Sequence, residues 1–585
     1  MHDIDGLQEA ERIAALFRTP RTVKLSKLRK YVDGTQYEGR EDFFSPKTDC
    51  PLLERAPCIV YPAVESAIRQ HIDLAIGEGR FPKLTTGIGE DDTELDDLFG
   101  LSEDDSKTFD AFLCQLAEHA RYQDVCADAL ESAEATSSAA VVYSVREGYL
   151  SGELVDPINA TATFATNGRD VERLEIRYPF IDLYQGEENK IRARCLLYRR
   201  VIDSTSDTVY VPAVAPSDGR EPRWQVDSER TADHGLGFCP VVWYAFKRRV
   251  RKANDNDGHA IHETLLDELD ALNFSLSQRH RAALYCGDPQ MIETGVSHDE
   301  QVAPAGSAPR ATIKELRDSD GRLIYGFGYS ERPRSARRKG AGTVWRYENE
   351  QAKVAMLTLP GDALAAVTDH CEDVLAKIEA VLGYTATSPE QVKGALSGKA
   401  LGFLFARTTA FVDRVRRDFW DGFMLPSLSM MLRIVHAIAK VSPDSLYVAG
   451  IRKAMPILER FQREVEGAGS QWFCPRIRPV WGRYFDNGPE DEKLTIESCA
   501  MAFEKGIMTR ELAVEKLRGI FAFDSASQIA EELDKKDEEE KALEAEQAQA
   551  DRDAMAAKPG AAEGKPAAKP GDKPGLKKPT AKPPE

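Results

Sequence analysis

The sequence predicts an α+β protein that is mostly helical, and two regions support this class. Between Ala395 and Lys440, apolar residues return at helical intervals, which predicts one long helix. Between Ala139 and Phe246, short segments rich in valine, tyrosine and threonine alternate with Gly, Asp and Pro, a pattern typical of strands. With 585 residues and 42% hydrophobic content, the chain has room for several folding units and a sizeable core.

Composition narrows the class of protein. The formal net charge of −19 argues against an open surface that grips nucleic acid by its phosphates, because such surfaces are basic. The first residues are acidic and amphipathic and do not have the pattern of a signal peptide, so we expect the protein to be made in the cytoplasm. We also expect no apolar run long enough to span a bilayer and no membrane partner. Ten cysteines without a close Cys-x-x-Cys pair indicate reduced thiols in the core.

The N-terminal part is predicted to be helical with loops. Residues 1 to about 80 contain amphipathic segments and a tyrosine-rich turn at Tyr31–Gly39, and the acidic run Gly89–Asp97 is expected to be a solvated loop. Phe109–Val145 has the pattern of a helix that leads into a strand. The β-rich region then closes with the apolar strand His234–Phe246.

Two further helices flank a small mixed region. Gly258–Cys286 is predicted to be a helix that ends at Gly287 and Pro289, and a second one follows Pro360. The apolar positions expected to be buried on them are Ile261, Leu265, Leu269, Leu272 and Leu276 on the first, and Leu364, Val367, Cys371, Val374, Ile378 and Val381 on the second. Between them lie four strand-like pieces, PQMIE, RLIYGF, GTVWRYE and AKVAMLTL.

The predicted long helix would measure roughly 60 Å at about 1.5 Å per residue. Pro426 lacks an amide donor, so we expect a kink just before it; a helical hairpin split there is the alternative. The apolar stripe of this helix comprises Leu401, Leu404, Phe405, Phe411, Val412, Val415, Phe419, Phe423, Leu428, Leu432 and Val435, and its polar side carries Arg407, Arg414, Arg416 and Arg417. Shorter helices are expected to about Leu533, and a mobile, charged and then Lys/Pro-rich tail from Asp534.

Motifs for catalysis are weak. Gly394–Ala400 resembles a phosphate-binding loop, but Lys393 occupies the place of its first glycine and Ala400 that of the required Ser or Thr. His259, His262 and Glu263 would share one helix face, but the zinc-protease pattern is absent and no further metal ligand is indicated. We therefore expect no enzyme, catalytic residue, cofactor or metal. A basic loop made of Arg332, Arg334, Arg337, Arg338 and Lys339 is either solvated or a contact for nucleic acid backbone.

The order of parts resembles the portal proteins of tailed bacteriophages. Leu265–Ser277 (LLDELDALNFSLS) matches a family pattern like LIDALN followed by serine, on the helix after the β-rich region. Ser397, Gly398, Ala400 and Leu401 match the SG-x-AL opening of the long helix. The resemblance covers about residues 25 to 535, and a longer clip and the Lys-Pro tail depart from the family pattern.

The resemblance implies a domain order. The expected parts are a wing (1–256), a first stem helix (257–286), a clip (287–359), a second stem helix (360–382), a tunnel loop (383–397), a long kinked helix (398–440), a crown (441–533) and the tail (534–585). It also implies a ring, in the family usually of twelve subunits, at one capsid vertex of the virion, assembled in the host cytoplasm. Double-stranded DNA would be packaged and ejected through it, and the partners would be terminase, capsid and scaffolding proteins and head-completion or adaptor proteins.

Charged stem residues are the candidate channel lining. Carboxylates repeated around a channel would repel phosphates and keep DNA from adhering. The candidates are Glu263, Asp267, Asp270, Glu372, Asp373 and Glu379 on the stem, with Glu390 and Lys393 on the tunnel loop. Two alternatives remain open at this point: a metal-dependent hydrolase that uses the His259 and His262 region, and a monomeric nucleic-acid-binding adaptor that uses Arg332 to Lys339.

Overall fold

The computed structural model contains helices and antiparallel sheets, as expected of an α+β protein. It describes residues 6–44, 49–86, 102–185, 191–247, 256–287, 290–294, 314–317, 323–326, 353–357, 361–386, 398–442, 445–465, 469–472, 477–485, 489–509, 512–513, 517, 533 and 535–536. The chain forms two compact units, one of residues 1–394 and 401–485, the other of residues 395–400 and 486–585.

The N-terminal part is helical with loops, as predicted. Its elements are α1 (Leu7–Leu16), α2 (Pro20–Val32), the 3-10 turn η1 (Leu52–Glu54), α3 (Ala63–Ile76), α5 (Glu103–His119) and α6 (Tyr122–Thr136). The side chain of Thr19 accepts from the amide of Thr22 at the start of α2, and Ser102 and Asp105 form a reciprocal capping box on α5. Each helix therefore begins directly after its N-cap residue, Thr19 for α2 and Ser102 for α5. The acidic run 89–97 lies outside the described residues.

The predicted β-rich region forms two antiparallel sheets. One has the order β10-β2-β3, and the other has the order β4-β5-β6-β7-β9 with β8 paired to β6. The strands are β2 (Ser138–Arg146), β3 (Tyr149–Val155), β4 (Ala160–Phe164), β5 (Val171–Gln185), β6 (Ile191–Ile202), β7 (Ser206–Val209), β8 (Ala213–Val214), β9 (Ala232–Asp233) and β10 (Val241–Ala245). All five residues of β10 are buried, which matches the apolar strand predicted there.

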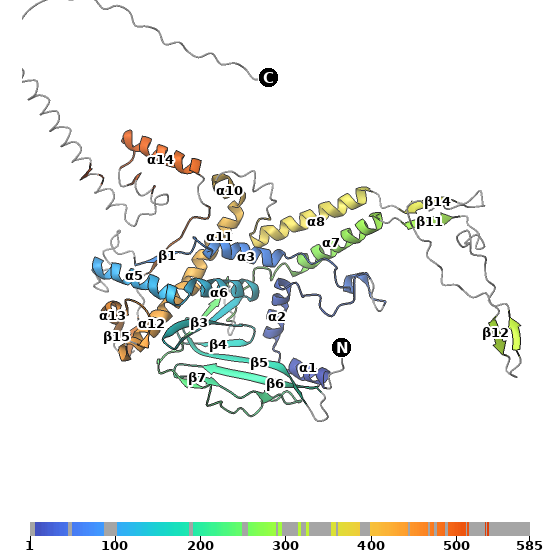
Figure 1. Ribbon diagram of the computed structural model, residues 1–585, viewed down its shortest axis with the longest axis horizontal. Coiled ribbons are helices and arrows are strands. Elements are labelled where there is room, and N and C mark those ends of the chain that lie inside the picture. The colour runs from blue at the N-terminus through green and yellow to red at the C-terminus, as the bar shows by residue number, and fades with distance from the viewer. Residues whose placement is uncertain are drawn as a thin grey trace, which may run out of the picture. The chain divides into compact units, whose positions relative to one another are not determined.

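The largest core lies between the helices and the three-stranded sheet. It joins side chains of α3, α5, α6 and β2 to those of the long helix, including Phe419 and Phe423. A separate small core forms where α1 packs on β6, with Ala10 and Ala14 against Cys195 and Leu197; Figure 1 shows α1 beside β5 and β6. Burial of this apolar surface is the main favourable term in folding.

Two helices run side by side in the first unit, α7 (Leu266–Gly287) and α8 (Gly361–Leu382) (Figure 1). The predicted start of α7 at Gly258 is wrong. The amides of Gly258 and His259 donate to Ser137 and Phe246, and that of Ile261 to Glu134, so these residues bind the neighbouring segments instead of a helical turn. The expected burial of Ile261 and Leu265 is nonetheless confirmed.

The mixed region between α7 and α8 contains two antiparallel pairs. β11 (Gln290–Thr294) pairs with β14 (Lys353–Leu357), and β12 (Lys314–Arg317) pairs with β13 (Leu323–Gly326). Three of the four predicted strand-like pieces thus contain strands, whereas GTVWRYE lies outside the described residues. β12 was not predicted, because its alternating charges give it little apolar signal.

The long helix is divided. It consists of α10 (Gly398–Leu404), α11 (Ala406–Phe419), the π-helical turn η4 (Trp420–Met424) and α12 (Leu425–Val441). Phe405 leaves the helical conformation (φ −97°, ψ 13°), which corrects the prediction of one continuous helix. The amide of Leu425 donates to Trp420 O, five residues back, so the irregularity expected just before Pro426 is a π turn. Eight of the eleven predicted stripe residues, from Phe411 to Val435, are buried.

Two expectations about this helix need correction. Ala406–Val441, 36 residues, is long and apolar enough by length and composition to cross a membrane, although we expected no such run. Because 56% of its most apolar 18-residue stretch is buried inside the protein, its packing is that of a core helix.

Arg416, expected on the polar side of the long helix, is only 5% exposed. It donates to the carbonyls of Leu74 (2.8 Å) and Ala75 (3.1 Å) at the end of α3.

The region after the long helix contains strands as well as the predicted short helices. Its elements in the first unit are α13 (Ile451–Glu459), β15 (Gln462–Val465) paired with β16 (Gly469–Trp472), and β17 (Arg478–Val480) paired with β1 (Lys83–Thr85). The second unit contains α14 (Pro489–Glu504). The tail beyond Lys536 lies outside the described residues.

The cysteines are partly as predicted. Cys126, Cys195, Cys239, Cys371 and Cys499 are buried free thiols. Cys58 and Cys114 are exposed, so the expectation that the thiols belong to the core is wrong for these two.

Candidate functional site

The candidate channel surface is the α7–α8 pair. Leu269 and Leu272 of α7, and Cys371, Val374 and Ile378 of α8, are buried in the core, which holds the two helices in place. Their opposite sides carry exposed acidic residues: Asp267 on α7, and Glu372 and Asp373 on α8. These three of the six predicted stem carboxylates are free to face solvent or another molecule.

Two other predicted carboxylates have partners within the chain. Asp270 accepts hydrogen bonds from the hydroxyls of Tyr31 (3.0 Å) and Tyr37 (2.6 Å). Burial, with the Asp270 charge and its hydrogen bond, raises the pKa of both tyrosines, so they remain donors at neutral pH. Asp270 therefore fixes the N-terminal segment to α7. The sequence prediction missed this because the tyrosines lie more than 230 residues away along the chain.

Glu263 is also paired, and it precedes α7 rather than lying on it. Its Oε1 is 2.6 Å from Lys24 Nζ, and its Oε2 is 3.0 Å from His259 Nδ1. Burial acts to raise the pKa of Glu263, but Lys24 and His259 outweigh it and lower the pKa. Glu263 thus connects α2 to the turn before α7, and its charge is already compensated.

Glu379, on the last turn of α8, is half-buried. Burial raises its pKa, and the nearby charge of Arg407 acts in the opposite direction. The remaining candidate residues, Glu390 and Lys393 of the predicted tunnel loop and Arg332, Arg334, Arg337, Arg338 and Lys339 of the basic loop, lie outside the described residues.

The two histidines weighed as metal ligands have separate partners. His262 is fully buried, and its Nε2 lies 3.0 Å from the carbonyl of Leu28, which can only accept, so Nε2 carries the proton. Burial lowers the pKa of His262 to about 4. His259 pairs with Glu263. Within the part of the chain that the structure describes, no three His, Cys, Asp or Glu side chains gather as metal ligands do.

The start of the predicted tunnel loop is held by α3 and α11. Gly383 ends α8 in the left-handed conformation (φ 73°), and His71 Nε2 lies 3.3 Å from its carbonyl. The Gln70 side chain bonds both the amide and the carbonyl of Thr385 (3.0 and 3.2 Å). Thr385 also bonds Thr408 of α11. The described part of this loop is therefore a fixed base.

A buried His–Glu pair supports this base. His71 Nδ1 is 3.0 Å from Glu134 Oε2, both side chains are fully buried, and the Phe411 ring stacks on the imidazole with centroids 4.4 Å apart. Both ring nitrogens face oxygen atoms, Nδ1 that of the Glu134 carboxylate and Nε2 that of the Gly383 carbonyl. This pair was not predicted, since neither residue stands out in the sequence.

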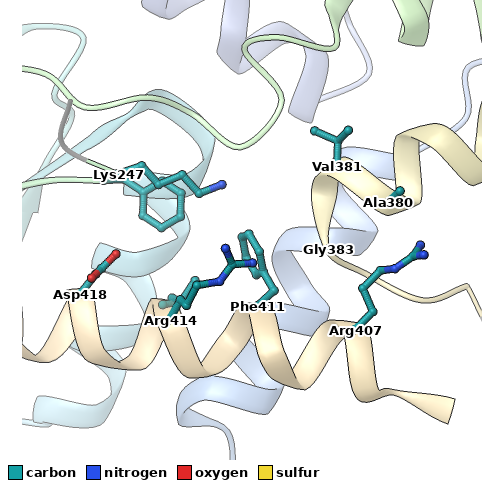
Figure 2. Close-up of a pocket in the computed structure, with 10 residues that line it drawn as sticks. Lys247, Ala380, Val381, Gly383, Arg407, Phe411, Arg414 and Asp418 are labelled. Atoms are coloured by element: carbon teal, nitrogen blue, oxygen red, sulfur yellow. The ribbon is translucent and has the colours of Figure 1, made fainter. Parts of the chain in front are cut away.

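A pocket of about 340 Å³ lies beside Gly383 (Figure 2). Its charged lining residues are Lys247, which follows β10, and Arg407, Arg414 and Asp418 of α11. Lys247 Nζ lies 4.6 Å from the centre of the Phe411 ring and 5.2 Å from that of Phe246. The only sequence signal of this site was the spacing of Arg407 and Arg414 on one helix face. With three cations, the pocket has the chemistry to hold an anion.

No protein-family model matches the chain, and no curated protein matches it either.

Proposed function

We propose that this chain is a portal protein of a tailed bacteriophage, which forms a ring at one capsid vertex through which DNA is packaged and ejected. The observation that carries the proposal is the order of elements: a β-rich region, α7, the β11–β14 pair, α8, the base of a loop, and the long helix with its π turn. This order agrees with the wing, stem, clip, stem, tunnel loop and kinked helix that the resemblance implies.

The exposed carboxylates support a channel role for α7 and α8. Asp267, Glu372 and Asp373 are exposed on this helix pair. In a ring, each would recur once per subunit, and a wall of carboxylates repels the phosphates of DNA, so that the duplex slides without a firm grip. Glu263 and Asp270, which have partners within the chain, are structural in this proposal.

The proposed role is that of a platform without catalysis. Its partners are further copies of itself, usually twelve in the family, double-stranded DNA, terminase, capsid and scaffolding proteins, and head-completion or adaptor proteins. The place of action is the virion, after assembly in the host cytoplasm. A closed ring requires each subunit to present two different, complementary faces.

Negative-stain electron microscopy and light scattering of the purified protein test this proposal. We expect ring-shaped particles with a central channel and a mass that is a fixed multiple of the monomer. Monomers or dimers alone, at every salt concentration from low to high, would contradict it.

A further inference from the structure

The pocket beside Gly383 carries an excess of positive charge. Among the ten described residues that line it, Lys247, Arg407 and Arg414 are cationic and Asp418 is anionic, a difference of two charges (three minus one). The side chains of these four charged residues are exposed, so water solvates them when the pocket is empty. In a chain with a formal net charge of −19, such a concentration of cations around one pocket would favour a negatively charged occupant.

The cations come from two sides. Arg407 and Arg414 are seven residues apart on α11, about two helical turns, so they share one face. Lys247 reaches in from the side opposite this helix (Figure 2). Lys247 has a positive φ of 45°, which is uncommon for a residue with a side chain.

We propose that this pocket binds a terminal phosphate group, either inorganic phosphate or the phosphate of a monoester. Such a group carries about −1.5 to −2 charges at pH 7 and three acceptor oxygens, which suits a lining with more cationic than anionic side chains. Guanidinium groups offer several planar donors to phosphate oxygens. A terminal group can enter a pocket by its tip, whereas a phosphodiester in a duplex continues on both sides.

The rest of the lining suits the carbon part of a monoester. Val381, at the end of α8, is 49% exposed although its spacing predicted burial, and it lines this pocket. Ala380 and the Phe411 ring add further apolar surface. A volume of about 340 Å³ lies at the small end of the range for ligand pockets, about 300–1,000 Å³, so a small phosphorylated molecule would fill it.

A structural alternative is that the cations only complement the C-terminus of α8. That end carries partial negative charge, has no basic residue of its own in the last turn, and lies against the pocket through Ala380, Val381 and Gly383. Arg407 also interacts with Glu379. Under this alternative, removing a cation lowers the stability of the protein without a specific effect on phosphate binding.

Calorimetric titration distinguishes a phosphate site from this structural alternative. The full-length protein is titrated with inorganic phosphate at pH 7.5 and constant ionic strength in sodium chloride. We expect saturable binding that Arg414→Gln weakens roughly tenfold or more, because hydrogen bonds to charged groups contribute that much. Arg417→Gln is the matched control, since Arg417 is exposed on the same helix but does not line the pocket. It should leave affinity unchanged.

A second variant should change phosphate affinity in the opposite direction. Asp418→Asn removes the carboxylate of the lining and should strengthen phosphate binding by roughly twofold to fivefold. No saturable binding, equal losses in the Arg414 and Arg417 variants, or weaker binding by Asp418→Asn would overturn the proposal. A blunt duplex without terminal phosphates should not displace phosphate. If it does so in a manner that depends on Arg414, the assignment to a terminal phosphate is wrong. None of these results bears on ring formation.

Discussion

At the scale of single residues, His262 makes folding depend on pH. Burial lowers its pKa from 6.5 to about 4, while its Nε2 proton is held by the carbonyl of Leu28 (3.0 Å). The folded protein therefore keeps the imidazole neutral where the unfolded chain protonates it. Because the unfolded state binds more protons between about pH 6.5 and pH 4, the free energy of unfolding falls as the pH falls through this window.

We predict that His262 alone accounts for a loss of about 3 kcal/mol across that window. His262→Gln keeps a donor for Leu28 but does not titrate, so its free energy of unfolding should vary less between pH 7 and pH 4.5. Urea denaturation of both proteins at several pH values measures the difference. The exposed His370→Gln is the control and should follow the wild type. Parallel pH curves for wild type and His262→Gln would show that His262 is protonated as easily in the folded state.

Some contacts of single residues could not be predicted from the sequence. The Tyr31 and Tyr37 hydroxyls that bind Asp270, and the Glu134 carboxylate that binds His71, are recognised only once distant segments are folded together. The periodicity of the long helix placed Arg416 with its polar neighbours, because charged residues are almost never buried unless paired. Its burial depends on the carbonyls that end α3, and those carbonyls have no sequence signal of their own.

At the scale of elements, the π turn η4 is fixed by close packing. The Tyr244 ring lies against Phe419 and Phe423, with ring centres 5.3 and 6.2 Å away, and a Cβ added at Gly422 would lie 2.7 Å from Tyr244 Cε2. Tyr122 also donates to the carbonyl of Met424 at 2.7 Å. Pro426 predicted the place of the irregularity, but its type depends on these partners from β10 and α6.

Gly422→Ala should therefore lower the free energy of unfolding by about 1–3 kcal/mol, the usual cost of overpacking a core. Gly402→Ala is the matched control on α10, where an added Cβ meets nothing within 4 Å. That change should be neutral or stabilise by up to about 1 kcal/mol, because alanine is the better helix former. Thermal and urea unfolding should thus show a lower stability for Gly422→Ala and an unchanged or higher stability for Gly402→Ala. A tolerated Gly422→Ala would mean that Tyr244 can move aside.

Element types were predictable where periodicity extended over many residues. The strand region, α8 and the buried stripe of α11 and α12 follow from spacing alone, since period-2 and period-3.6 patterns reflect burial on one face. The start of α7 was not predictable in this way. Ile261 and Leu265 have helical spacing and are buried, yet their segment is held by hydrogen bonds to Ser137, Phe246 and Glu134.

At the scale of the whole molecule, the proposed ring predicts that the exposed acidic residues of α7 and α8 affect how strongly DNA is retained. If they line a channel, their charges act on DNA inside the ring, whereas acidic residues elsewhere alter only the net charge. Glu372 and Asp373 are exposed on α8, and Glu172 and Glu229 are exposed in the β-rich region. The two pairs permit a comparison in which the net charge changes by the same amount.

We predict that the double variant Glu372→Gln, Asp373→Asn assembles normally but retains DNA more strongly at low salt, by at least roughly threefold, because the two carboxylates are lost from every subunit and each contributed a repulsion of about 1 kcal/mol or less. The gain should vanish near 1 M salt, where the screening length is about 3 Å. The control variant, Glu172→Gln with Glu229→Gln, should retain DNA as the wild type does.

Retention is measured on purified rings by filter binding of a labelled duplex across a salt series. Ring formation is checked by electron microscopy of the same samples. Equal gains for both pairs would mean that net charge alone governs retention, and intact rings without any gain would show that this face of α8 lies away from the DNA.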